Sequence, residues 1–220
     1  DGDHCLADAD TWAYLTTNGL LQSPTTYRGV NRALWGETDG AKTMSFTLDI
    51  GDGNMFQMVT NADNWVAQKA GNDVTVNIIS GTYQTGKRLR LANTDTSVAT
   101  VNVSGGRVEV GRDQLIIGTD SATPPEPLFR MTGGGLTVRS GLLLKSGTFE
   151  IQGSSITEIT LGSNGEGYAE IDGTIKAMVD AGGITPIIAT DDGADGIAGA
   201  VTFEAGSLLD VSFLGSGTSG

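Results

Sequence analysis

One pattern recurs along this chain at a short and nearly regular interval, and it limits the available folds more than any other feature. Residues 101–110 read apolar, polar, apolar, polar, two small residues, any residue, apolar, polar, apolar, and residues 129–138 repeat this order. Further copies, some of them looser, begin at Phe46, Val76, Phe149, Ala169 and Val201. Period-two alternation is typical of β-strands with one buried face, and glycine supplies the positive φ that a tight corner needs.

A third apolar segment follows each copy, so that one unit holds three short strands. These segments are residues 89–91, 115–117, 142–144, 159–161 and 187–189. Copies counted from Val76 begin 25, 28, 20, 20 and 32 residues apart. This spacing predicts an all-β fold, a parallel three-sided β-solenoid with loops inserted at one corner. Right-handed winding fits the irregular loops better than the rigid hexapeptide repeat of left-handed solenoids. A β-propeller blade needs about 40 residues or more. A β-sandwich is the competing fold, because it explains the alternation although not the recurrence in phase.

Stacked coils place like residues over like residues, so the repeat also predicts which side chains are neighbours. The expected interior column consists of the first residue of each copy: Val76, Val101, Phe129, Phe149, Ala169 and Val201. In the outward column beside it, Arg130, Glu150 and Glu170 would lie on successive coils.

The chain divides into three parts on this basis. Residues 1–70 do not repeat cleanly and hold all three tryptophans. They are expected to cap the first coil, or to dock on another molecule, because an open solenoid end exposes apolar core and unpaired strand groups. Short helices are expected over residues 6–15 and 61–67. Residues 71–214 are expected to form the coils, and the glycine- and serine-rich residues 215–220 a flexible tail.

These repeats resemble the glycine-rich β-solenoid repeats of bacterial exported proteins, of the autotransporter-associated and PEP-CTERM-bearing types. The resemblance rests on residues 101–110 and 129–138 with the Leu-Ile-Ile-Gly segment between them, and it covers about residues 60–214. Residues 61–65 resemble the Asn-Trp element before such repeats, and residues 206–213 resemble their closing segment. The resemblance implies secretion or display on the surface of a bacterium, with a structural or matrix role rather than a reaction.

Composition excludes several classes of function. The formal net charge is −13, from 26 acidic and 13 basic residues, which argues against nucleic acid or an acidic membrane as a partner. The apolar runs are far shorter than a transmembrane segment of roughly 20 residues. Cys5 is the single cysteine, so no internal disulfide forms, and His4 is the single histidine, which excludes zinc sites with two histidines.

Glu150 and Glu170 are the candidates for catalysis. Two carboxylates about 5 Å apart would raise the pKa of one of them, as acid–base hydrolysis of glycosides requires. A ladder of Arg130 and these glutamates that only solubilises the sheet is the alternative interpretation.

Acidic turns are the candidate Ca²⁺ sites, and no other cofactor is expected. The residues are Asp49, Asp52, Asp191, Asp192 and Asp195. None of these turns has the spacing of an EF-hand, and solvated acidic turns are the alternative interpretation.

Two sets of apolar residues suggest self-association. Ile116 and Leu143 occupy the outward position of the third strand and would form an exposed stripe, unless the N-terminal segment covers it. The second set lies in the last coil and comprises Val201, Phe203, Leu208, Val211 and Phe213. We therefore expect a non-enzymatic, secreted structural protein that associates with itself, plausibly head-to-tail into fibres or a biofilm matrix. The alternatives are a carbohydrate-active enzyme or polysaccharide-binding module, and a trimeric adhesin or phage spike.

Overall fold

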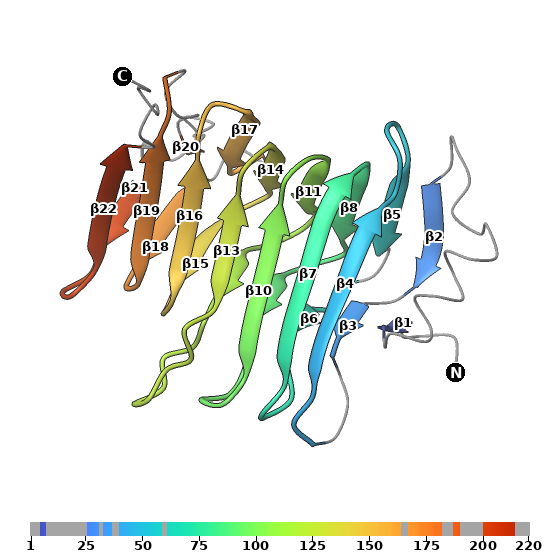
Figure 1. The fold of residues 1–220 in the computed structure, drawn as a ribbon, viewed down its shortest axis with the longest axis horizontal. Coiled ribbons are helices and arrows are strands. Elements are labelled where there is room, and N and C mark those ends of the chain that lie inside the picture. Colours follow the sequence, from blue (N-terminus) through green and yellow to red (C-terminus); the bar gives the residue numbers. More distant parts are fainter. Residues whose placement is uncertain are drawn as a thin grey trace, which may run out of the picture.

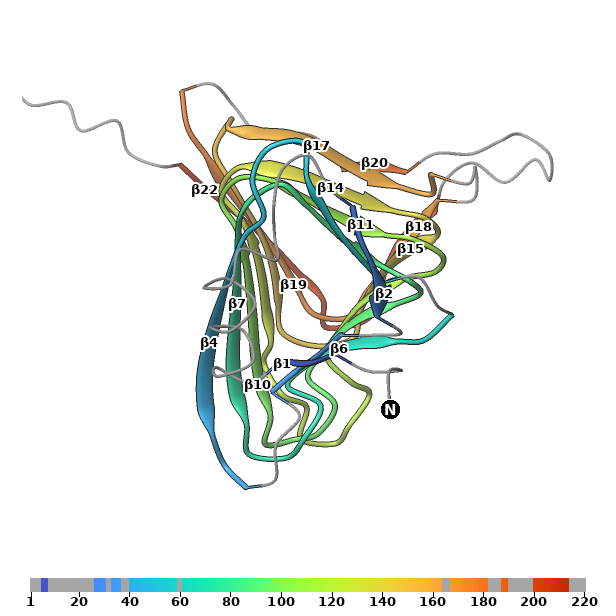
Figure 2. The same ribbon diagram turned by 90° about the vertical axis from the view of Figure 1, so that its right-hand side faces the viewer.

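The computed structural model describes residues 5–7, 26–30, 33–36, 40–58, 61–163, 167–181, 187–189 and 200–213. These residues form parallel strands that wind into stacked three-sided coils (Figures 1 and 2). The predicted all-β, three-sided parallel solenoid is therefore confirmed.

The strands form three sheets, called A, B and C below, and paired strands are parallel. Each turn of the solenoid contributes one strand to sheet B, then one to sheet A and then one to sheet C. Within the described residues, sheet A contains eight strands: β1 (Cys5–Ala7), β3 (Ala33–Trp35), β6 (Asn64–Val66), β9 (Leu89–Leu91), β12 (Leu115–Ile117), β15 (Gly141–Leu144), β18 (Tyr168–Ile171) and β21 (Ala200–Phe203). Sheet B contains seven: β2 (Thr26–Val30), β5 (Met55–Met58), β8 (Thr82–Thr85), β11 (Arg107–Val110), β14 (Gly134–Val138), β17 (Ile156–Leu161) and β20 (Ile187–Ala189). Sheet C contains seven: β4 (Thr43–Asp49), β7 (Asp73–Ser80), β10 (Val98–Val103), β13 (Leu128–Met131), β16 (Thr148–Gln152), β19 (Thr174–Val179) and β22 (Leu208–Phe213).

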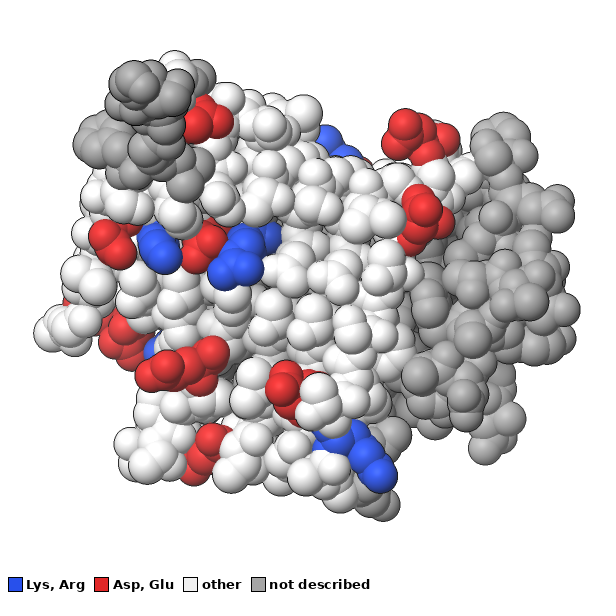
Figure 3. Space-filling model, in the orientation of Figure 1, with Lys and Arg blue, Asp and Glu red and all other residues white. Residues whose placement is uncertain are grey.

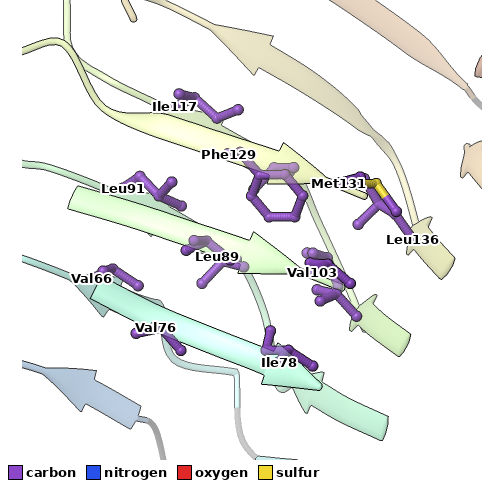
Figure 4. Close-up of a cluster of buried hydrophobic side chains, with 14 of the residues drawn as sticks. Val66, Val76, Ile78, Leu89, Leu91, Val103, Ile117, Phe129, Met131 and Leu136 are labelled. Atoms are coloured by element: carbon purple, nitrogen blue, oxygen red, sulfur yellow. The ribbon is translucent and has the colours of Figure 1, made fainter. Parts of the chain in front are cut away.

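Like residues stack over like residues through the first part of sheet C, as the repeat predicts. Phe46, Val76, Val101, Phe129 and Phe149 are in register on successive strands, and all five are buried. The rings of the last two lie 5.6 Å apart between centroids. Figure 4 shows how side chains from different strands meet inside the coils to form one continuous core.

The interior column continues differently after Phe149 from what the repeat predicts. Its next members are Ile175 of β19 and Leu209 of β22. Ala169 and Val201 lie in sheet A instead, where they continue from Leu142. The expected column is therefore wrong over its last two members.

The segments expected to be the third strands of their coils are also misplaced after Phe149. Residues 159–161 and 187–189 lie in sheet B, not in sheet A. The physical reason is that all three sheets have one inward face, so each strand shows the same alternation followed by a glycine corner. The local pattern identifies a strand without identifying which of the three sides it occupies.

The recurrent glycine pair occupies the corner between sheets C and B. Gly106 and Gly134, the second residue of each pair, have φ of +66° and +69°. A Cβ atom added to Gly134 would lie 2.2 Å from the carbonyl oxygen of Gly106. This contact explains the repeated motif, because only glycine gives both the left-handed conformation and the close approach of neighbouring coils.

The coils begin before residue 71. Strands β2 to β6 belong to the same three sheets as the later strands. The helix expected over residues 61–67 is wrong, because Asn64 and Trp65 lie in β6. The Oδ1 atom of Asn64 accepts a hydrogen bond of 2.8 Å from the backbone N–H of Ala33, which fastens β6 to the preceding coil. Of the helix expected over 6–15, residues 6 and 7 lie in β1, and residues 8–15 fall outside the described part, as does the tail 215–220.

Candidate functional site

The structure separates the two glutamates proposed for catalysis. Glu150 lies in sheet C between Arg130 and Lys176, whereas Glu170 lies in sheet A between Leu143 and Thr202. The expected pairing of the two carboxylates is therefore wrong, and the cause is the shift of register after Phe149.

Glu150 instead belongs to a ladder of alternating charge. Its Oε1 atom accepts a hydrogen bond of 2.8 Å from Nε of Arg130, and its Oε2 atom lies 3.6 Å from Nζ of Lys176. Asp210 follows Lys176 in the same column. Figure 3 shows acidic and basic side chains alternating in a row on this face. Glu150 is only 5% exposed, so both cations serve to stabilise its buried charge.

The candidate Ca²⁺ sites gain no support from neighbouring ligands. The Oδ1 atom of Asp49 accepts a hydrogen bond of 2.5 Å from Oγ of Ser80. No group of three or more His, Cys, Asp or Glu side chains gathers anywhere in the described part of the chain, which includes Asp52. Asp191, Asp192 and Asp195 lie outside the described residues.

Ile116 and Leu143 are direct neighbours in sheet A, as expected, but they do not form an exposed stripe. Ile116 is only 8% exposed and Leu143 is half-buried. They continue an outward column that contains Trp65 and Arg90, whose guanidinium carbon lies 4.4 Å from the tryptophan ring centre. The expectation of an open apolar patch here is wrong for Ile116.

The C-terminal end of the solenoid exposes residues that belong to interior columns. Phe203 continues the column of Ile171, and Leu209 continues the column of Ile175. Phe203 is nevertheless 49% exposed, Leu209 57% and Val211 54%, and Leu208 beside them is also exposed. The expected residues Val201 and Phe213 lie in β21 and β22, the last strands of sheets A and C.

The interior residues at the opposite end of sheet C, in β4, differ in their exposure. Phe46 and Leu48 of β4 point into the same interior and are fully buried. Interior side chains of sheet C are therefore buried at β4 and exposed at β22.

The outer face of sheet B carries a hydrogen-bonded polar row that runs from coil to coil. Gln57, Gln84, Glu109 and Thr137 are in register on β5, β8, β11 and β14. Nε2 of Gln57 donates to Oε1 of Gln84, and Nε2 of Gln84 donates to Oε2 of Glu109 at 2.7 Å. Hydrogen bonds thus link the row from Gln57 to Glu109 along the solenoid axis.

Arg107 neutralises the acidic groups of this face. Its Nε atom lies 3.0 Å from Oε1 of Glu109 and its Nη1 atom 3.0 Å from Oε2 of Glu158, and Nη2 donates to Oγ1 of Thr137. Burial lowers the pKa of Arg107, but the hydrogen bond and charge of Glu158 and the charge of Glu109 outweigh it, so this pKa is raised. The hydrogen bond from Arg107 is the main influence that lowers the pKa of Glu158, with smaller help from Thr160.

Two adjoining depressions lie beside this row, at the corner between sheets B and A. One has a volume of about 330 Å³ and is lined by Gln57, Gln84 and Arg112, among others. The other has a volume of about 340 Å³ and is lined by Gln84, Glu109, Thr137 and Arg139, among others. Both share Gln84 and Gly111, so together they follow the axis across successive coils.

The β-strand repeat does not single out these residues, although the sequence contains another signal for them. Lysine or arginine follows the second strand of three successive copies within one or two residues: Lys87 with Arg88, Arg112, and Arg139. A basic residue recurring at one corner predicts a basic ridge parallel to the axis, once the coils are stacked.

The fold and these surfaces define a β-solenoid with a polar groove on one side and an exposed apolar C-terminal end. Comparisons with protein-family models, curated proteins and solved structures find no match. Among the described residues, no helix is long and apolar enough to cross a membrane.

Proposed function

We propose that this chain is a structural β-solenoid that associates with itself through its C-terminal end. The observation that carries the proposal is the exposure of interior-column residues, with Leu209 and Val211 each more than half exposed. An exposed apolar surface of this kind is the usual mark of a contact surface. Among the described strands, β22 pairs only with β19, so its other edge also offers backbone hydrogen-bonding groups to a partner.

The partner that suits this end best is the same end of a second copy. A head-to-tail fibre would need the interior at β4 to be open as well, yet Phe46 and Leu48 are buried there. A pair of C-terminal ends related by a two-fold axis buries both apolar surfaces at once and then closes, because a two-fold contact uses the same patch on both copies. The expected product is a dimer of end-to-end solenoids.

Export to a bacterial surface or matrix is part of this proposal and is supported by the family resemblance of the repeats. A dimer with two closed outer ends would act as a short rod or spacer there, rather than as a growing fibre. This context does not affect the test, which concerns the chain alone.

The test measures the mass of the purified chain by light scattering over a concentration series from micromolar to millimolar. The wild-type chain is expected to be a dimer, and Val211→Lys a monomer because it places a charge in the contact. Val98→Lys is the matched control, since Val98 is similarly exposed at 47% but lies on β10 in the middle of the rod. This control is expected to remain dimeric.

Other outcomes would contradict the proposal in distinct ways. A wild-type chain that stays monomeric at millimolar concentration, or a Val211→Lys variant that remains dimeric, refutes association through this end. Filaments in electron micrographs would overturn the two-fold contact in favour of head-to-tail assembly. A trimeric mass would overturn the dimer in favour of a spike.

A further inference from the structure

The groove on sheet B has the properties of a binding site for a long, linear ligand. Its polar row repeats a hydrogen-bonding side chain on each coil, and neighbouring coils are about 4.8 Å apart. That spacing is close to the length of one sugar ring along a polysaccharide chain. The two depressions adjoin at Gln84 and Gly111, which line both of them. A polymer lying along the axis would therefore meet a similar set of groups at each step.

The charge of this face is opposite to that of the chain as a whole. Residues 55–63, 82–88, 107–114, 134–140 and 156–163 supply sheet B from β5 to β17 and its corner with sheet A. They contain five of the 13 basic residues and only four of the 26 acidic ones, a local net charge of +1. The rest of the chain then carries −14, because the total is −13. The excess of positive charge favours an anionic ligand at this face.

Two of these cations are available to a ligand. Arg88 lies 2.9 Å from Asp113, and Arg107 is held by Glu109 and Glu158. Arg112 and Arg139 are exposed, line the two depressions, and form no ion pair within the described residues. Their guanidinium groups have the planar geometry that binds carboxylates through two parallel hydrogen bonds.

The remaining lining discriminates among anionic polymers. The amides of Gln57 and Gln84 each use one N–H in the row, and an amide nitrogen has two, so each keeps a donor for a hydroxyl group. No aromatic side chain lines either depression, so nothing there would stack on a nucleobase or on a neutral sugar ring. Glu109 on the floor disfavours a densely charged polyphosphate.

We propose that the sheet B groove binds an acidic polysaccharide of the uronic acid class. Arg112 and Arg139 hold carboxylates of the polymer, while Gln57, Gln84 and Thr137 bind its hydroxyl groups. Both oxygens of Glu109 already accept hydrogen bonds from Arg107 and Gln84, which holds its side chain in the row.

The experiment titrates the full chain with polygalacturonate by calorimetry, and with dextran as the neutral polymer. Binding of polygalacturonate is expected, with no heat from dextran. The double variant Arg112→Gln/Arg139→Gln is expected to bind roughly tenfold more weakly or worse, because two charge-assisted contacts are lost. The double variant Lys42→Gln/Lys145→Gln removes the same charge from other corners and is expected to bind within about twofold of wild type, a small change on the same free-energy scale.

Several results would overturn the assignment. Equal loss of affinity in both double variants means that overall charge alone governs binding. Equal affinity for dextran excludes a role for the carboxylates, and equal affinity for a single-stranded DNA oligonucleotide makes the groove a general polyanion site. No binding by the folded wild-type chain refutes the site outright. The monomeric Val211→Lys variant is expected to retain full binding, which separates this proposal from that of self-association.

Discussion

Asn72 offers the most direct test of how one coil is fastened to the next. Its side chain is fully buried at the corner between sheets A and C. Its Nδ2 atom donates to the carbonyl oxygen of Gly36 at 2.7 Å, and its Oδ1 atom accepts from the backbone N–H of Lys42 at 3.1 Å. The variant Asn72→Leu keeps a similar volume but removes both hydrogen bonds. A buried polar group left without a partner costs about 1–3 kcal/mol, and the more exposed N–H of Lys42 can bind water. We therefore expect the free energy of unfolding to fall by about 1–3 kcal/mol.

The variant Asn72→Asp separates hydrogen bonding from shape. It keeps an acceptor for Lys42 but sets a carboxylate oxygen against the carbonyl of Gly36. Burial disfavours the charged form, so the pKa of the new carboxyl should be raised in the folded state. When the carboxyl pKa is higher in the folded than in the unfolded state, the free energy of unfolding falls as the pH rises above the unfolded-state pKa. At lower pH the protonated acid can donate a hydrogen bond to the carbonyl oxygen of Gly36. The deficit in stability should therefore shrink when the pH falls from neutral towards the ordinary range of an aspartate pKa.

The assay is urea unfolding followed by circular dichroism, with Asn93→Leu as control. Asn93 is exposed at the corresponding corner after β9, so its replacement should change stability by less than about 0.5 kcal/mol. The reasoning fails if Asn72→Leu unfolds at the same urea concentration as Asn93→Leu. It also fails if the deficit of Asn72→Asp does not change with pH.

Two further predictions test the register and the charge network. With Cys5 changed to serine, cysteines that replace Glu150 and Lys176 should form a disulfide under mild oxidation, whereas cysteines that replace Glu150 and Glu170 should not. A gel-shift assay distinguishes the cross-linked from the free chain. Cross-linking of the second pair alone would support the register expected from the repeat. The pKa of Glu158 is lowered in the folded state, chiefly by its hydrogen bond with Arg107. The ionised carboxylate of Glu158 therefore stabilises the fold at pH values above the ordinary glutamate pKa of 4.5, and this stabilisation is lost as the pH falls through the lower folded pKa. The melting temperature of Glu158→Gln should accordingly lie below that of wild type at neutral pH and approach it in acid, and a difference that is constant with pH would contradict this.

Local sequence patterns predict much of the fold of this chain. Alternation and the glycine pair correctly placed Val101 and Phe129 one above the other, because a buried face and a left-handed corner are both imposed by neighbours in sequence. The same signals misplaced Ala169, whose segment reads like that of Phe149 although the two lie on different sides of the solenoid. Which side a strand occupies depends on the length of the preceding corner and on packing across the coil, and no short window of sequence contains either.

How well the candidate sites could be predicted depended on how well the register between neighbouring coils was predicted. The exposed residues of the last coil, such as Val211, were expected from their place at the end of the repeat. The groove was missed because Gln57 and Gln84 are ordinary outward-facing residues until stacking aligns them. Glu150 was selected for the wrong reason, because its neighbour on the following coil is a lysine rather than a second glutamate. A candidate residue could thus be predicted where its position along the rod was enough, and could not where the prediction required knowledge of the adjacent coil.

The charge ladder on sheet C also limits how two C-terminal ends can meet. In an antiparallel pair of β22 strands, residues directly opposite each other face the same side. Centring the two-fold axis on Asp210 would place two carboxylates side by side, which is unfavourable. Centring it on Val211 instead sets valine against valine, Leu209 against Phe213, and Asp210 against Ser212 of the second copy. Both arrangements join the interior columns, but only the second does so without repulsion. The ladder on sheet C would therefore also select the register of the proposed end-to-end contact.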